Sequence, residues 1–157
     1  MKALLSEVVK FVSGLIGPVA DAFAGTVASD VVSLSKYKKA LILIKRGVGT
    51  TGTQTFTVEA CDDFTPSNTT AIPFKYRRRS SGDTLGAWAD AAAAGFTSAA
   101  GGSDAYIIEI DADDLPEGKP NFRLKSVEVV DAAVVADVEI ILSQPRYAGD
   151  VLPTAIA

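Results

Sequence analysis

The chain has 157 residues, enough for one domain that buries a sizeable core without disulfides. It contains no histidine and a single cysteine, which excludes an internal disulfide, tetrahedral zinc of the usual Cys/His type and a hydrolase triad in its ordinary form. The formal net charge of −4 argues against general nucleic-acid binding, and no apolar run reaches membrane-spanning length.

Residues 3–16 predict an amphipathic helix that ends at Gly17-Pro18, because their apolar side chains fall on one side of a helical wheel. We expect this apolar side to bind a partner or a second copy of the chain. Packing on the chain's own domain also remains open, as does a membrane surface, which is disfavoured because the polar side is not rich in Lys or Arg. The residues predicted to make these contacts are Leu4, Leu5, Val8, Phe11, Val12 and Leu15.

The next stretch, residues 18–29, is rich in small residues and predicts an extended arm. Asp30–Leu34 predicts a short strand. The chain is then organised around Ala40–Ile44, whose five consecutive apolar residues predict a strand covered on both faces. In Thr53–Cys61 apolar and polar residues alternate, and we expect this strand to pair with the preceding one as an antiparallel hairpin.

Ala71–Arg79 predicts a strand at or near a sheet edge, since Pro73 cannot donate a hydrogen bond to a neighbouring strand. Its last residues, Arg77, Arg78 and Arg79, form the one dense basic patch of the sequence. Two interpretations remain open. Either the patch grips an acidic partner surface or phosphate, or it is a solvated edge that discourages sheets from sticking together.

Residues 80–102 are rich in Gly, Ala and Ser and predict a long loop with a short strand near Phe96-Thr97. Trp88, the only tryptophan, is either an interface anchor or an ordinary core residue. Ala105–Asp111 alternates and predicts a strand. The acidic loop over residues 111–118 predicts one capped helical turn, because it lacks the glycine and terminal glutamate of an EF-hand calcium site.

Phe122–Val130 predicts a strand whose apolar positions change phase, which a bulge or bend near Ser126 would explain. Residues 138–142 predict the last strand. Pro145–Tyr147 then leaves the sheet, and the small apolar tail over residues 151–157 is expected to pack on a neighbouring subunit.

These elements predict a mainly β fold: an antiparallel, jelly-roll-like β-sandwich with an N-terminal amphipathic helix and an extended arm. We divide the chain into the helix and arm (residues 1–29), the sandwich (residues 30–147) and a tail (residues 148–157). Neither a phosphate-binding loop nor a dinucleotide fingerprint is present. A carboxylate pair such as Glu59 and Glu109 could act as in a glycosidase if the two met in a cleft, but both lie on the polar side of alternating strands. We therefore expect a protein that is not an enzyme, holds no cofactor or metal, and binds neither nucleic acid nor membrane.

Six segments share a pattern with one group of proteins: Pro18–Phe23, Asp30–Leu34, Val58–Asp63, Ile72–Arg77, Ile108–Leu115 and Pro145–Tyr147. Through these segments the sequence resembles small structural proteins that decorate or cement the outside of tailed-bacteriophage heads. The resemblance implies a β-rich homotrimer that is made in the host cytoplasm and joins the surface of the virion. There it would bind the major capsid protein and stabilise the contacts between capsid subunits.

This role implies where partners should bind. Residues 1–30 and the tail over residues 146–157 would reach neighbouring subunits, and the basic patch would meet an acidic capsid surface. Besides the six N-terminal apolar residues, the expected partner-binding residues are Arg77, Arg78, Arg79, Trp88, Arg146 and Tyr147.

Two alternatives from other classes remain open. One is a carbohydrate-binding or adhesion sandwich, for which the aromatic candidates are Trp88, Tyr37, Tyr106 and Tyr147. The other is a neck or tail connector protein, which would form a ring of more than three subunits. Glycan binding tests the first alternative, and the oligomer mass tests the second.

Overall fold

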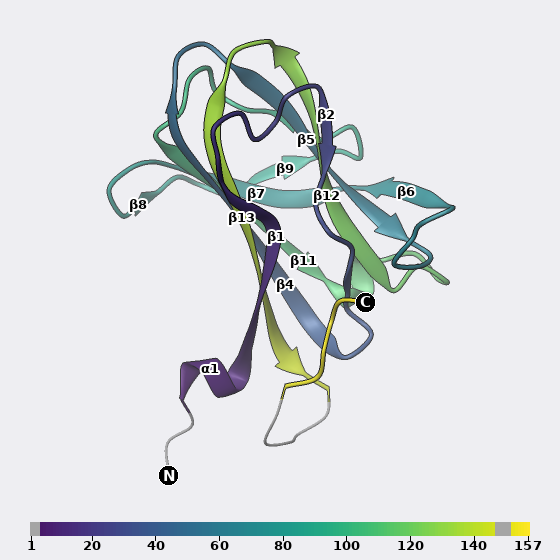
Figure 1. Cartoon of the computed structure of the whole chain (residues 1–157). Helices are drawn as coiled ribbons and strands as arrows, with labels where there is room; N and C mark the ends of the chain where they lie inside the picture. Colours follow the sequence, from purple (N-terminus) through teal and green to yellow (C-terminus); the bar gives the residue numbers. More distant parts are fainter. Residues whose placement is uncertain (1–3, 147–151) are drawn as a thin grey trace.

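The computed structural model describes residues 4–146 and 152–157 of the chain (Figure 1). Two antiparallel sheets pack face to face and enclose the core between them, so the predicted β-sandwich is confirmed. One short helix, α1 (Leu5–Val8), precedes the first strand.

The sheets differ in size. The seven-stranded sheet has the order β1 (Val9–Val19), β13 (Val134–Pro145), β4 (Tyr37–Gly49), β11 (Asp104–Asp111), β7 (Phe74–Ser81) and β8 (Thr84–Leu85), with β9 (Ala89–Ala91) also paired to β7. The six-stranded sheet has the order β10 (Phe96–Thr97), β5 (Thr53–Cys61), β12 (Asn121–Val130) and β2 (Thr26–Ala28), with β3 (Val32–Ser33) paired to β12 and β6 (Thr69–Ile72) paired to β5. The predicted turn after β11 is the 3-10 helix η1 (Ala112–Asp114), and the Asp111 side chain caps it.

Alternation along the long strands builds the core. Side chains at every second position point inward and are buried, whereas the positions between them face outward. The seven-stranded sheet contributes Ala40, Ile42, Ile44, Ile108, Ile110, Val138, Ile140 and Leu142. The six-stranded sheet contributes Phe56, Val58, Ala60, Phe122 and Leu124. The strands predicted over residues 105–111 and 138–142 are confirmed as β11 and β13.

The predicted hairpin is wrong. β4 pairs with β11 and β13, whereas β5 pairs with β12, β10 and β6, so the two strands lie in opposite sheets. Alternation determines which face of a strand is buried but not which strand it pairs with, and both strands present an apolar face to the core. The connecting turn therefore crosses the sandwich. At its end a Cβ on Gly52 would lie 2.3 Å from the carbonyl oxygen of Ala132, so only glycine fits there.

The predicted N-terminal helix is wrong over most of its length. From residue 4 onward, only Leu5–Val8 is helical, and Val9–Val19 forms β1, which pairs with β13; residue 3 lies outside the described residues. Apolar residues four positions apart suit either a helix face or a strand face, and the β-branched and aromatic residues here favour a strand once β13 offers a partner. The predicted apolar side is thereby divided. Val12 and Leu15 pack in or against the core, whereas the exposed members are Leu4, Leu5, Val8 and Phe11.

The predicted extended arm packs into the sandwich instead. β2 pairs with β12, and Phe23 is buried with its ring edge-on to that of Phe56, at 5.1 Å between ring centroids. Small residues gave the whole stretch over residues 18–29 the composition of a loop. One aromatic side chain inside it is sufficient to anchor the segment to the core.

The strand predicted over residues 71–79 is two strands, because Pro73 separates β6 from β7 and the chain changes sheets there. β7 lies between β11 and the short strands β8 and β9. The bulge or bend predicted near Ser126 is not found there: the pairing of β12 with β5 is regular at Ser126 and shifts only between Glu128 and Val130, and Ser126 itself is buried. Outward-facing valines, and not a bulge, cause the change of phase along β12.

The end of the tail packs on its own domain. The Ala155 carbonyl oxygen accepts a hydrogen bond from the Ser33 backbone N–H at 2.8 Å. The Tyr37 hydroxyl donates to the Pro153 carbonyl oxygen at 2.6 Å. Contact of this tail with a neighbouring subunit stays a prediction, and Ile156, which is 43% exposed, is the large apolar side chain there that remains open to it.

Candidate functional site

An exposed apolar surface lies at the N-terminal end of the described chain. Leu4 and Leu5 are 65% and 69% exposed, and Val8 and Phe11 are 43% and 51% exposed. β1, which follows, is the outermost strand of the seven-stranded sheet, with β13 as its partner. Among the described residues no strand pairs with its other edge, and the one backbone hydrogen bond recorded to β1 from outside its own sheet is that from the Asp30 N–H to the Gly14 carbonyl oxygen, at 3.1 Å. The rest of this edge can therefore accept a further strand. We call these four side chains and the free edge of β1 the N-terminal edge.

An apolar band continues from this edge across the outer face of the seven-stranded sheet. The strand register places Phe11 beside Ile141 and Ile141 beside Leu41, and one row further along it places Leu43 beside Ile107. All but Phe11 are half-buried. Within this chain, strand β4 is therefore covered on its inner face only, whereas its five apolar residues predicted a strand covered on both faces. We call these five residues the outer apolar band, a pattern typical of sheets whose outer face is covered by another layer.

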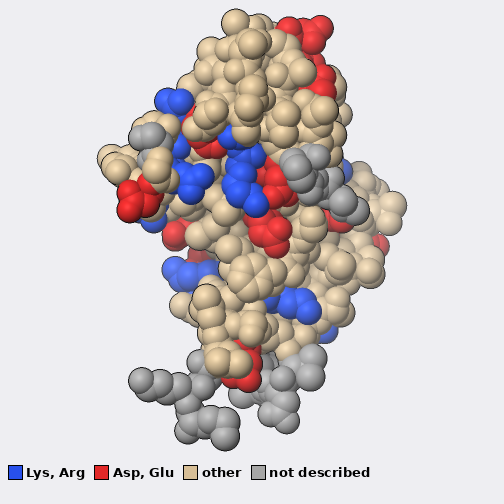
Figure 2. All heavy atoms as spheres, turned by 60° about the vertical axis from the view of Figure 1, so that its left-hand side comes forward, with Lys and Arg blue, Asp and Glu red and all other residues tan. Residues whose placement is uncertain are grey.

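A second exposed apolar surface lies at the far end of the sandwich, the upper end in Figure 1. The register places Val130 beside Thr53 and Val134 beside Gly49, so the turn after β12 and the turn after β4 lie together. Figure 2 shows that most of this upper end is uncharged, whereas acidic and basic side chains intermingle below it. We call its exposed valines the valine tip: Val48, Val127, Val129 and Val130.

The basic patch predicted at the end of β7 is divided among three environments. The Arg77 guanidinium lies over the Trp88 indole, 4.4 Å from the ring centroid. Arg78 donates through Nε to the buried Asp104 carboxylate at 2.7 Å. Arg79 is half-buried. Successive side chains of a strand point to opposite faces, so three consecutive arginines do not present one surface.

The remaining candidates lie apart from the N-terminal edge. Trp88 is 41% exposed and forms a wall of a groove on the seven-stranded sheet. Arg146 is exposed, and its backbone N–H donates to the Lys36 carbonyl oxygen at 2.8 Å. Tyr147 lies outside the described residues. The predicted contact residues therefore occupy separate places and do not form one site.

The sequence analysis missed a buried polar network around Arg46. This side chain donates to both carboxylate oxygens of Asp104, at 2.8 and 3.1 Å, and to Gln54 and Ser98 at 3.1 and 2.8 Å. The side chains of Arg46 and Asp104 are 0% and 1% exposed. Arg46 follows Ile42 and Ile44 at the same inward parity, which is the signal that predicts its burial.

The proposed carboxylate pair of Glu59 and Glu109 does not form, since the first lies on the six-stranded sheet and the second on the seven-stranded sheet. Glu59 accepts hydrogen bonds from Arg123 at 2.8 Å and from Lys125 at 3.1 Å. Burial raises the pKa of Glu59, but the hydrogen bonds and charges of Arg123 and Lys125 outweigh it and hold the pKa below its usual value. This carboxylate is therefore ionised and paired, as in a structural ion cluster.

Replacing Glu59 with glutamine should lower the free energy of unfolding at neutral pH by about 1–3 kcal/mol, because hydrogen bonds between charged groups are lost. The lowered pKa means that ionised Glu59 stabilises the fold above its unfolded pKa of about 4.3 and loses this effect as the pH falls through the folded pKa. Urea denaturation of both proteins from neutral to strongly acidic pH should show the difference shrinking toward acid. An equal difference across the range would contradict the ion cluster.

Within residues 4–146 and 152–157, no group of three or more His, Cys, Asp or Glu side chains is arranged to hold a metal ion. In the same part of the chain, no helix has the length and apolar character needed to cross a membrane. No family model matches the sequence, and no curated protein matches it significantly.

Proposed function

We propose that this protein is a structural virion protein, which decorates the outside of a phage head and stabilises contacts between major capsid subunits. The observation that carries the proposal is the N-terminal edge together with the outer apolar band. Monomeric soluble proteins rarely leave a large contiguous apolar patch exposed, and such patches mark interaction surfaces. An unpaired strand edge beside the patch adds backbone groups that a partner strand can bind.

The two exposed apolar surfaces lie at opposite ends of the sandwich, with α1 at the lower end of Figure 1 and the valine tip at the upper end. A cement protein needs such a separation, because it joins neighbours by contacting more than one of them at once. Several weak contacts made together give an avidity well above that of each one. The sandwich between them acts as a rigid spacer.

Self-association as a homotrimer comes from the family resemblance, and the N-terminal edge is the surface we assign to it. The Phe11→Asp variant places a charge in that surface at a residue that is 51% exposed, so the fold should survive. We expect the wild-type mass from light scattering to be three times the 16.3 kDa of the chain. The oligomer of the variant should already dissociate at protein concentrations at least about tenfold higher than those at which the wild-type oligomer dissociates.

The matched control is Leu85→Asp, at an exposed leucine on β8 outside both apolar surfaces, which should keep the wild-type mass. A monomeric wild type, or an oligomer unchanged by Phe11→Asp, would contradict the assignment of the N-terminal edge. A ring of more than three subunits would instead favour the neck or tail connector.

Capsid binding is tested by co-sedimentation with heads that lack this protein. We expect the wild type to pellet with the heads, and the Val48→Asp/Val129→Asp variant of the valine tip to lose at least about tenfold in affinity. Deleting residues 1–17 is a poorer test, because it removes most of β1 from the sheet. Wild-type protein that stays in the supernatant would overturn the decoration role.

A further inference from the structure

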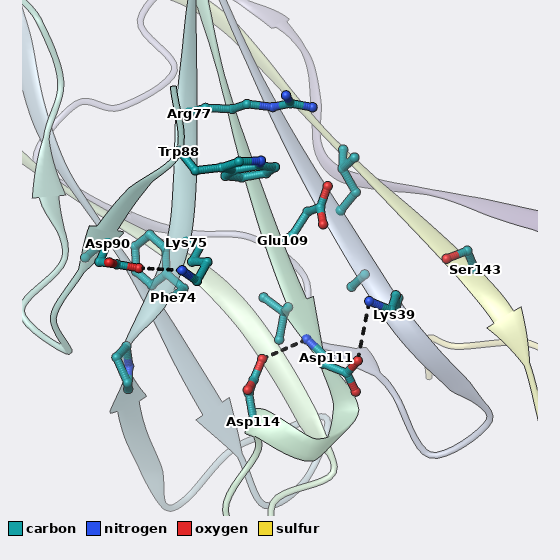
Figure 3. A pocket seen from close by; sticks show the side chains of 15 residues that line it. Lys39, Phe74, Lys75, Arg77, Trp88, Asp90, Glu109, Asp111, Asp114 and Ser143 are labelled. Carbon is teal, nitrogen blue, oxygen red and sulfur yellow. Dashed lines mark hydrogen bonds and ion pairs between the residues drawn. The ribbon is translucent and has the colours of Figure 1, made fainter. Parts of the chain in front are cut away.

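A groove with a volume of about 920 Å³ lies on the outer face of the seven-stranded sheet. Residues of β4, β11 and β7 line it, and the segment that carries Trp88 and β9 closes one side (Figure 3). Sites for small molecules typically have volumes of roughly 300–1,000 Å³ and combine apolar walls with a few polar groups. The groove is large enough for a ligand of two or three sugar rings.

Trp88 supplies the aromatic wall of the groove. Arg77 covers one face of the indole, at 4.4 Å from the ring centroid, and Figure 3 shows Lys75 and Asp111 on the opposite side of the ring. Trp88 is the last residue of the loop before β9, and the next residue, Ala89, pairs with Tyr76 of β7, so the loop is anchored to the sheet directly after the tryptophan. Its uncovered face is therefore a fixed platform that opens into the groove.

Polar groups surround this platform in pairs. Lys75 Nζ lies 3.0 Å from the Asp90 carboxylate, and Lys39 Nζ lies 3.6 Å from the Asp111 carboxylate. Glu109 is exposed, lines the groove beside them and makes no ion pair within the described residues. A further lining carboxylate, Asp114, accepts a hydrogen bond from the Asp111 backbone N–H at 2.9 Å. The groove therefore offers both ammonium donors and carboxylate acceptors, and Glu109 is the acceptor left without a partner among the described residues.

We propose that this groove binds a neutral saccharide. A sugar ring presents C–H groups on one face, and these pack on the electron-rich face of an indole. Its hydroxyl groups both donate and accept hydrogen bonds, which matches the mixed donors and acceptors around Trp88. The basic and acidic side chains nearly balance, so neither an anion nor a strongly cationic peptide is favoured. This inference uses Trp88 and Glu109 and does not depend on the capsid role.

The other described aromatic candidates do not take part. Tyr37 is fully buried, and its hydroxyl donates to the Pro153 carbonyl oxygen. Tyr106 is also buried, and its hydroxyl accepts a hydrogen bond from the Ala99 backbone N–H. Of the three described candidates, Trp88 alone offers an exposed ring.

The test exploits the single tryptophan of the chain, because intrinsic fluorescence then reports on Trp88 alone. Glucose, galactose, mannose, N-acetylglucosamine and their disaccharides are titrated into the full-length protein. We expect at least one of them to give a saturable change in emission. A lysine-rich peptide and inorganic phosphate are titrated in parallel, and a response to either of these without a response to any sugar would overturn the proposal.

Calorimetry with the best sugar then compares variants. Trp88→Ala and Glu109→Gln should each weaken binding by at least about tenfold, as expected for a central contact of a small site. The control is Leu85→Ala, which has a similar exposure to Trp88 and lies outside the groove, and it should bind like the wild type. Glu109→Gln keeps the side-chain shape, so it tests the site even where Trp88→Ala disturbs β9. Unchanged affinity in Glu109→Gln and Trp88→Ala, or no response to any sugar, would overturn the proposal.

Discussion

Replacing Arg46 with alanine should lower the free energy of unfolding by about 3–5 kcal/mol, the usual cost of removing one partner of a buried ion pair. The guanidinium lies fully buried against Asp104 and also donates to Gln54, Ser98 and the Ala99 carbonyl oxygen. Without it the Asp104 carboxylate keeps only Arg78, which is 41% exposed, and the other acceptors lose their charged donor. Urea denaturation, monitored by circular dichroism, measures the loss.

Two comparisons make this result specific. Asp104→Asn removes the shared partner of Arg46 and Arg78 and should also destabilise strongly, and the double variant should cost less than the sum because both changes affect one network. Lys75→Ala breaks an ion pair whose side chains are mostly exposed, so it should change stability by no more than about 1 kcal/mol. An Arg46→Ala loss as small as that of Lys75→Ala would mean that the network adds nothing to stability.

This network also bears on the proposed capsid contact. Arg46 lies near the end of β4 and Gln54 near the start of β5, and Val48 lies between them, on the last residues of β4. The hydrogen bonds between them tie the two sheets together at the end where the valine tip lies. An exposed apolar surface binds with less loss of conformational entropy when its backbone is already fixed. The buried charges therefore stiffen the surface that we assign to the capsid.

Strand alternation allowed the faces of the sandwich to be predicted but not its strand pairing. Ala40–Ile44 and Thr53–Cys61 were both expected as strands and both form them. Their assignment to one hairpin failed because the pairing of a strand depends on contacts with residues far away in the sequence, such as β11 and β13. The same limit applies to β1, where a helical pattern was overridden by a partner more than a hundred residues later.

The candidate site could be predicted from the sequence only where neighbouring residues along the chain form part of it. Leu4, Leu5 and Phe11 were predicted as contact residues and are exposed, although the predicted helix is wrong at Phe11, which lies in a strand. The groove at Trp88 was not, since its lining comes from β4, β7, β9 and β11 and only the folded sheet brings them together. A lone tryptophan in a Gly/Ala-rich stretch gave no means of choosing between core and surface.

Replacing Phe56 with alanine should lower the free energy of unfolding by about 3–5 kcal/mol, because a fully buried aromatic ring is removed from the centre of the core and leaves a cavity. The ring is 0% exposed and lies 5.1 Å from Phe23, 5.7 Å from Phe96 and 6.3 Å from Tyr106, measured between ring centroids. These neighbours come from the segment before β2, from β10 and from β11, so one side chain joins both sheets to the segment that was expected to be a free arm. Urea denaturation of the variant at neutral pH measures the effect.

Phe64→Ala is the matched control, because the same atoms are removed from a half-buried ring in the loop after β5, outside the core cluster. It should cost about 1 kcal/mol or less, as ordinary substitutions outside the core do. Equal losses in the two variants would mean that the ring at position 56 has no special role in holding the sheets together. A large loss confined to Phe56→Ala would instead support the view that residues 20–25 unfold together with the sandwich, since Phe23 in that segment packs on Phe56.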